Sequence, residues 1–223
     1  MSTNLTTLLT QTRDYLDEPT SSRWSDAELT RYINAGLRQL QSQIQAANDD
    51  YFLRVETATA VSGSYQLAFP ADIWGNKLRG VWFYDNVTAV GGMPYRLEPS
   101  PIESVYSQMY LSGIPYMYAY HAGFIRWAPV SQHTGTFRFI YSMKETALVA
   151  GPDTIGQIGD EHTDCISLYA GIIARDKVGA PTTELKAMYN TRMQQIQNDV
   201  QPTDPITTPQ HNIDPAYARW SIR

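Results

Sequence analysis

Apolar positions near the start of the chain recur at helical spacing in two stretches. The first stretch ends at Asp17-Glu18-Pro19, where proline disfavours helical geometry in the residue before it. The second opens with Ser25-Asp26-Ala27-Glu28, in which Ser25 and Glu28 have the spacing of a capping box. The positions are Leu5, Leu8, Leu9, Thr12 and Leu16, then Leu29, Ile33, Leu37, Leu40 and Ile44. These patterns predict a short helix to about residue 16 and a longer helix from Ser25 to about Asn48.

From about residue 51 to residue 144 the pattern changes to short β-branched and aromatic runs separated by Gly, Pro, Asn and Asp. Strands are expected over residues 52–59, 64–67, 78–84, 93–97, 116–121, 124–127 and 136–143. The last run alternates, so that Phe137, Phe139 and Tyr141 share a face that we expect to be core. The other face holds Arg138, Ile140 and Ser142. Residues 101–109 predict a short helix between strands, because proline is tolerated in its first turn.

Two further helices are expected at about residues 161–177 and 182–200. Their apolar positions are Cys165, Leu168, Tyr169 and Ile172, then Leu185, Met188, Tyr189, Met193 and Ile196. The fold class predicted is α+β: the N-terminal and C-terminal helices pack as a small helical bundle from which a β-rich central insertion projects. The expected divisions are residues 1–50 and 151–200 for the bundle and 51–150 for the insertion.

Beyond Val200 the chain has prolines at 202, 205, 209 and 215 and no periodicity, which predicts neither a helix nor a central strand. Residues 201–223 are therefore expected to form an extended arm. Apolar, aromatic and arginine side chains are spaced along it, and aromatic residues and arginine are often decisive in interface cores. These anchors are Ile206, Ile213, Tyr217, Arg219, Trp220, Ile222 and Arg223. We expect the arm to fold on a binding partner.

Composition and charge argue against several functional classes and cellular locations. A net charge of −5 argues against a surface that neutralises DNA phosphates, although an acidic channel wall would let DNA slide without sticking. One cysteine, Cys165, cannot form a disulfide within the chain and fits production in a reducing cytoplasm. The start of the sequence lacks a basic segment followed by an apolar core, and no run approaches a membrane span. Neither secretion nor membrane insertion is expected.

Three local patterns resemble sites of chemistry. Residues 160–164, Asp-Glu-His-Thr-Asp, combine His and carboxylates as zinc sites do, but they fall in the first turn of a predicted helix, where acidic groups are favoured and Asp160 can act as the cap. Cys165 falls on an apolar stripe and is expected in the core. Gly91-Gly92 lacks the rest of a phosphate loop and predicts a hairpin turn. We therefore predict no catalytic residue, no metal site, no cofactor and no enzymatic activity.

An ordered series of motifs runs through most of the chain. The series begins with an N-terminal helix that ends in an acidic residue before a short loop. The further marks are residues 24–29 (WSDAEL) leading to 31–35 (RYINA), 65–72 (YQLAFPAD), Gly113-Ile114-Pro115 with Tyr118, Pro129, Phe139-Ile140-Tyr141 and the helix around Ala170. In this order the motifs resemble those of the head-to-tail connector (adaptor) proteins of tailed bacteriophages.

The resemblance implies a ring of twelve subunits whose helical part docks under the portal protein and whose β-rich part faces tail or nozzle proteins. It implies that the arm reaches up to grip portal subunits, and that DNA passes through the channel without specific binding. Such a chain is a structural virion protein of the neck, made in the host cytoplasm. No membrane partner is expected.

Two other functional classes fit parts of the sequence. A carbohydrate-binding or other interaction module would use an aromatic β surface, for which the candidates are Trp74, Trp82, Tyr84, Tyr116, Tyr118, Tyr120 and Trp127. Core packing and subunit interfaces also use such residues. A metal-dependent hydrolase centred on His162 ranks third.

Overall fold

Residues 3–18, 23–85 and 94–201 are described by the structure, which is a computed structural model. This part of the chain has a mixed α+β fold, as the sequence predicts. Its helices are α1 (Leu5–Tyr15), α2 (Asp26–Ala47), α3 (Ile102–Gln108), α4 (Asp164–Lys177), α5 (Thr183–Asp199) and the 3-10 helix η1 (Asp160–His162). Its strands are β1 (Leu53–Ala60), β2 (Gln66–Ala68), β3 (Ile73–Asp85), β4 (Tyr95–Pro99), β5 (Met117–His121), β6 (Phe124–Ala128) and β7 (Gly135–Met143).

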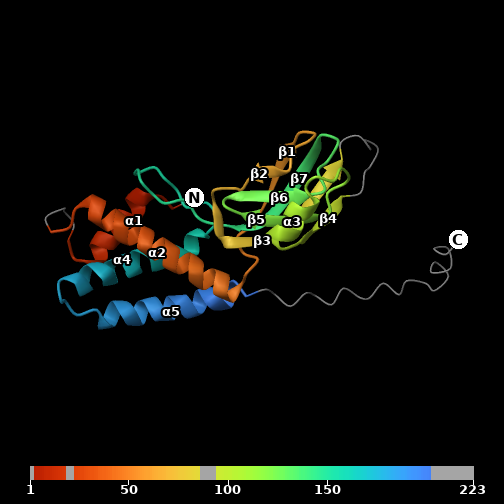
Figure 1. The fold of residues 1–223 in the computed structure, drawn as a ribbon. Coiled ribbons are helices and arrows are strands. Elements are labelled where there is room, and N and C mark those ends of the chain that lie inside the picture. Colours follow the sequence, from red (N-terminus) through yellow and green to blue (C-terminus); the bar gives the residue numbers. More distant parts are fainter. Residues whose placement is uncertain (1–2, 19–22, 86–93, 202–223) are drawn as a thin grey trace, which may run out of the picture.

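The helices α1, α2, α4 and α5 gather on one side of the molecule, and the strands with α3 lie on the other (Figure 1). We call these groups the helical half and the β half. One continuous apolar core runs through both, from Leu8 and Ile44 in the helices to Phe52 and Trp127 in the β half. Because burial of apolar side chains is the main stabilising term in folding, this shared core holds the two halves together.

Helix α4 is the centre of the helical half, because it packs against α1, α2 and α5. All five positions of the predicted α2 stripe are buried. In α5 the prediction is right for Leu185, Met193 and Ile196 but wrong for Met188, whose surface is 43% exposed. Helix α5 packs mainly against α4, so its buried stripe is narrower than the sequence suggests. Within the described ranges, no helix combines the length and apolar character that a bilayer crossing requires.

The start of α2 departs in one respect from the predicted capping box. The Ser25 hydroxyl accepts a hydrogen bond from the Glu28 backbone N–H at 3.2 Å, as expected. The Glu28 carboxylate, however, accepts from the Tyr32 hydroxyl at 2.9 Å and from the Lys177 ammonium group. The hydrogen bond from Lys177, with that from Tyr32, lowers the pKa of Glu28. An ion pair to the end of α4 has therefore replaced the second half of the box.

The β half is a seven-stranded sheet in the order β1-β7-β3-β4-β5-β6-β2. Neighbouring strands are antiparallel except for β4 and β5, which are parallel. Trp127 on β6 and Phe137 on β7 belong to strands well separated in this order, yet their ring centroids lie 4.3 Å apart. The sheet must therefore curl, so that β6 faces β7 across its interior.

The interior of the curled sheet is aromatic. Phe137, Phe139 and Tyr141 are buried, which confirms the predicted core face of the last strand. Phe137 lies 5.0 Å from Phe83 of the neighbouring strand β3, measured between ring centroids. Aromatic contacts of this kind add to the free energy gained by burial alone.

Strand β3 is the element whose bounds differ most from the prediction. The sequence predicts residues 78–84, whereas β3 begins at Ile73 and ends at Asp85. Its pairing with β7 shifts register between Ile73 and Leu78, and again between Leu78 and Gly80. Such irregularities interrupt the alternation of apolar and polar side chains from which strands are predicted. The other strands lie within two residues of their predicted bounds.

Candidate functional site

The junction between the halves is fixed by two amide side chains of α2. Gln41 donates from Nε2 to the carbonyl of Met143 at 2.8 Å and accepts from the backbone N–H of Glu145 at 3.2 Å. About two turns earlier in α2 and on the same side, Asn34 likewise donates to the carbonyl of Leu148 and accepts from its backbone N–H, each at 2.8 Å. Both amides thus satisfy backbone groups at the last residue of β7 and in the segment that follows it. The segment that connects the halves is held rigidly against α2.

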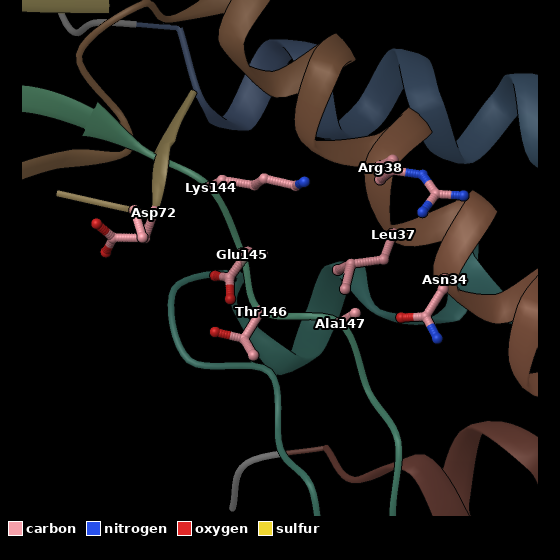
Figure 2. Close-up of a pocket in the computed structure, with 9 residues that line it drawn as sticks. Asn34, Leu37, Arg38, Asp72, Lys144, Glu145, Thr146 and Ala147 are labelled. Carbon is pink, nitrogen blue, oxygen red and sulfur yellow. The ribbon is translucent and has the colours of Figure 1, made fainter. Parts of the chain in front are cut away.

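A cavity of about 280 Å³ opens beside this junction (Figure 2). Lys144 extends across it toward α2, where Arg38 lies, and the Asp72 side chain points away from the other labelled residues. Small-molecule sites usually enclose roughly 300–1,000 Å³, so the cavity is small for a ligand site. It is lined by Asn34, Leu37, Arg38, Ala71, Asp72, Lys144, Glu145, Thr146 and Ala147.

Two groups with raised pKa values, Tyr141 and Glu145, lie close to this junction. The Tyr141 hydroxyl lies 2.8 Å from Glu56 Oε2 and 2.9 Å from Asp72 Oδ1, and Arg54 pairs with Asp72. Burial, together with these two carboxyl partners, raises the pKa of Tyr141 far above its usual value. Burial also raises the pKa of Glu145, whose Oε1 accepts from the backbone N–H of Gln157 at 2.7 Å. Both side chains are engaged in holding strands and loops, which is a structural role.

The acidic cluster at residues 160–164 is split among separate partners. The Asp160 carboxylate accepts from the backbone N–H and the hydroxyl of Thr3, at 2.6 and 2.8 Å. Asp164 pairs with Arg192, and His162 is buried with Nε2 3.8 Å from Glu161. Among the described residues, no three His, Cys, Asp or Glu side chains lie close enough together to hold a metal ion.

The predicted cap at Asp160 is wrong. The residues before α4 form η1 instead of a first α-helical turn, and α4 begins at Asp164 with Thr163 in the N-cap position. The Asp160 side chain is drawn to the N-terminal segment because Thr3 offers it two donors at once.

Cys165 lies in the core, as predicted. Burial, followed by the negative charge of Asp164, raises the pKa of its thiol to about 12. A cysteine nucleophile needs a lowered pKa and an accessible sulfur. Cys165 has neither property.

One row of side chains crosses the outer face of the sheet. Trp82 on β3 stands directly opposite Arg138 on β7 and Arg96 on β4, so all three point to the same side. The Arg96 guanidinium carbon lies 6.0 Å from the Trp82 ring centre, and Arg138 donates to the Tyr84 hydroxyl at 3.3 Å. We call Arg96, Trp82 and Arg138, with the neighbouring apolar residues Val55 and Ile140, the Arg–Trp face. Arginine and tryptophan are enriched among residues that dominate binding interfaces.

The Trp82 ring is folded over Gly80, and Gly80→Ala is expected to displace it. A Cβ atom at position 80 would lie 2.5 Å from Cη2 of Trp82, which is too close for real atoms. Because Trp82 is only half-buried, its ring can swing outward to make room for the Cβ atom. We therefore expect the overpacking to lower the free energy of unfolding by only about 1 kcal/mol. Urea denaturation would measure the lost stability. A red shift of tryptophan emission would report the displaced ring, and this shift should disappear when Gly80→Ala is combined with Trp82→Phe.

Gly156→Ala serves as the control for that substitution, because a Cβ at position 156 meets nothing within 4 Å. It should leave stability and emission close to those of the parent chain. Unchanged emission in Gly80→Ala would contradict the placement of the ring.

A second exposed surface is formed by α3 and the residues that follow it. The backbone there is fixed: Val130 donates to Leu111 at 2.9 Å, Gly113 donates to Val130 at 3.0 Å, and Tyr116 donates to Ala128 at 3.1 Å. The side chains nevertheless point outward, with Tyr110 87% and Leu111 56% exposed. We call Glu103, Tyr106, Tyr110, Leu111, Ile114 and Tyr116 the α3 surface. A rigid segment with exposed large apolar side chains is typical of a protein interaction site.

The aromatic residues considered as a sugar-stacking surface do not form one face. Trp127 and Tyr118 are buried, whereas Tyr116 and Tyr120 are exposed and Trp82 lies on the outer face of the sheet. Trp74 and Tyr84 are half-buried. Core packing accounts for Trp127 and Tyr118, and a subunit interface for the exposed residues stays a prediction.

The predicted arm residues lie outside the described part of the chain. These are Ile206, Ile213, Tyr217, Arg219, Trp220, Ile222 and Arg223. Gly91-Gly92, predicted to form a hairpin turn, also lie outside it.

Sequence reasoning missed both exposed surfaces. Arg96 and Arg138 are brought together by strand register, which the alternation of a single strand does not reveal. The α3 surface has a signal in the sequence, since residues 104–120 contain no charged side chain. In a chain with 17% charged residues, such a run indicates either core or interface, and in the structure more than half of its large apolar side chains are exposed.

Comparison with known protein families gives a match over most of the chain. A protein-family model described as "SU10 adaptor protein" matches residues 3–211, which include both halves. The search of curated proteins found no significant match.

Proposed function

Because the chain belongs to the SU10 adaptor protein family, we propose that it is a structural subunit that joins the portal of a tailed bacteriophage to its tail. The observation that carries the proposal is the extent of the match, which runs from residue 3 to residue 211. It spans the helices, the sheet and the junction between them, and is therefore a match to a whole architecture rather than to one shared motif. The head-to-tail adaptor resemblance found in the sequence agrees with this family.

In the proposed assembly, copies of the chain form a closed ring, with twelve subunits as the expected number. Residues 1–50 and 151–200 act as a helical bundle that docks under the portal, and residues 51–150 face tail or nozzle proteins. The arm, residues 201–223, reaches the portal. The hydrogen bonds of Asn34 and Gln41 to the connecting segment fit a subunit that transmits load, because they tie the helical half to the β half.

The proposed role is non-enzymatic. The groups that most resemble chemical sites are used for structure: the Cys165 thiol is buried with a raised pKa, and Asp160 anchors Thr3. DNA would pass through the ring without specific binding, which a chain of net charge −5 favours. The place of action is the neck of the virion.

The first test is the mass of the purified chain, measured by light scattering alone and after mixing with the portal protein of the same phage. We expect a large complex of fixed stoichiometry when portal is present, because the arm needs a partner on which to fold. A chain that stays monomeric in the presence of portal would contradict the adaptor role. Binding to glycans under the same conditions would favour the carbohydrate-binding alternative.

A further inference from the structure

A closed ring of identical subunits joins two different surfaces of each subunit at every boundary. The inference below rests on the proposed ring and asks which two surfaces meet. The surfaces must be separate on the fold, and they must complement each other in charge and in apolar character.

The Arg–Trp face has the properties of one side of such a boundary. Neither Arg96 nor Arg138 forms an ion pair with a carboxylate of the described residues, although the chain is acidic overall. Val55 beside them is 50% exposed, and Ile140 and Trp82 are half-buried. The face therefore offers two arginines without an ion pair around an apolar centre, and exposed Glu98 lies two residues from Arg96 on the same side of β4.

The α3 surface has the opposite character. Glu103 is exposed in the first turn of α3 and has no cationic partner among the described residues. The rest of the named residues are uncharged, with Tyr110, Leu111 and Ile114 in the loop that follows α3. One cation borders the surface, because the guanidinium carbon of Arg126 on β6 lies 5.2 Å from the Tyr106 ring centre. The α3 surface therefore offers a carboxylate without an ion pair beside a large apolar contact area.

The two surfaces are centred on different strands of the curled sheet. Trp82 and Arg138 belong to β3 and β7, whereas α3 packs on β5 and β6 (Figure 1). Strand β4, which carries Arg96, lies between them, and its Glu98 backbone N–H donates to the Tyr116 carbonyl of the α3 surface at 2.8 Å. Arg138 is the arginine farther from the α3 surface in strand order, so one copy can present Arg138 and Glu103 to two different neighbours. We propose that the α3 surface of one copy packs on the Arg–Trp face of the next copy, with Glu103 placed against Arg138 or Arg96.

The composition of the Arg–Trp face favours a second copy over DNA as the occupant. A surface that binds the DNA backbone gains affinity from many clustered cations. Here two arginines flank the exposed side chain of Val55 and the half-buried side chains of Trp82 and Ile140, and aromatic residues with arginine are enriched in interfaces between proteins. The α3 surface supplies the matching carboxylate and apolar groups on the same chain.

The test is a charge exchange between the two surfaces. Arg138→Glu and Glu103→Arg chains are purified separately, mixed with portal, and the yield of rings is measured by light scattering and electron microscopy. Each variant alone is expected to form at least tenfold fewer rings at the concentration where the wild type is half assembled, because like charges then meet at every boundary. An equal mixture of the two variants should restore assembly, since alternating copies again place opposite charges together. A chain that carries both substitutions should also assemble.

The outcomes separate this inference from the proposed function. Circular dichroism melts matching the wild type would show that both variants fold. If the wild type forms a complex with portal and all variants assemble equally, or if neither the mixture nor the double variant recovers, the two surfaces do not meet and the inference is overturned. If Arg138→Glu assembles normally but loses retention of double-stranded DNA, the face is a DNA contact, which also overturns it. If the wild type forms no ring, the adaptor role fails and the inference fails with it.

Discussion

Removal of residues 202–223 is expected to abolish the complex with portal while leaving the rest of the chain folded. The cut falls after Gln201, so that Val200 remains buried and its carbonyl still accepts from the Asn48 side chain at 2.9 Å. The removed residues contain the predicted anchors Ile206, Tyr217 and Trp220, which contribute binding energy only when a partner is present. Light scattering of the truncated chain with portal would measure the loss, and its urea midpoint should match that of the full chain.

Single substitutions make the same test without shortening the chain. Trp220→Ala is expected to weaken portal binding by about 2 kcal/mol, or roughly thirtyfold, as loss of a buried aromatic anchor does. Thr207→Ala in the same segment is the control, since it removes a small polar group and should change affinity little. Normal attachment of the truncated chain would contradict the role of the arm. Equal effects of Trp220→Ala and Thr207→Ala would contradict the choice of anchors.

Periodic patterns in the sequence were sufficient to predict most of the fold. The stripe from Leu29 to Ile44 predicts α2 and its buried face, because a helix brings every third and fourth residue to one side. The alternation from Phe137 to Tyr141 predicts β7 and the core of the β half for the equivalent reason in a strand. Local spacing determines which face of an element is apolar, and burial follows from that.

Features that depend on neighbours distant in sequence could not be predicted in this way. The Arg–Trp face exists because β4, β3 and β7 pair in one register, and a shift of one residue would turn Trp82 inward. Asp160 and Glu28 have the spacing of helix caps but bind Thr3 and Lys177, which reach them through tertiary packing. Tertiary packing decides which hydrogen-bond partner such a side chain reaches. The local sequence shows only the partners that are near in the chain.

Gly36→Val is expected to lower the free energy of unfolding by about 3 kcal/mol, near the upper end of the range for overpacking. Gly36 lies on α2 where that helix crosses α4, and a Cβ atom there would be 2.8 Å from the backbone carbonyl oxygen of Ile166. A backbone group cannot rotate away as a side chain can, so the two helices would have to separate. Since α4 also packs against α1 and α5, the separation would disturb the whole helical half.

Gly171→Ala on α4 is the matched control, and its expected effect has the opposite sign. A Cβ at position 171 would lie 3.5 Å from Tyr15 and 3.6 Å from Leu185, which are ordinary contact distances. Alanine favours a helix over glycine by about 1 kcal/mol, so this variant should be stabilised by up to that amount. Urea denaturation of both variants measures the difference. Equal destabilisation by the two substitutions would mean that α4 is crowded along its whole length, and would contradict a close approach confined to the crossing at Gly36.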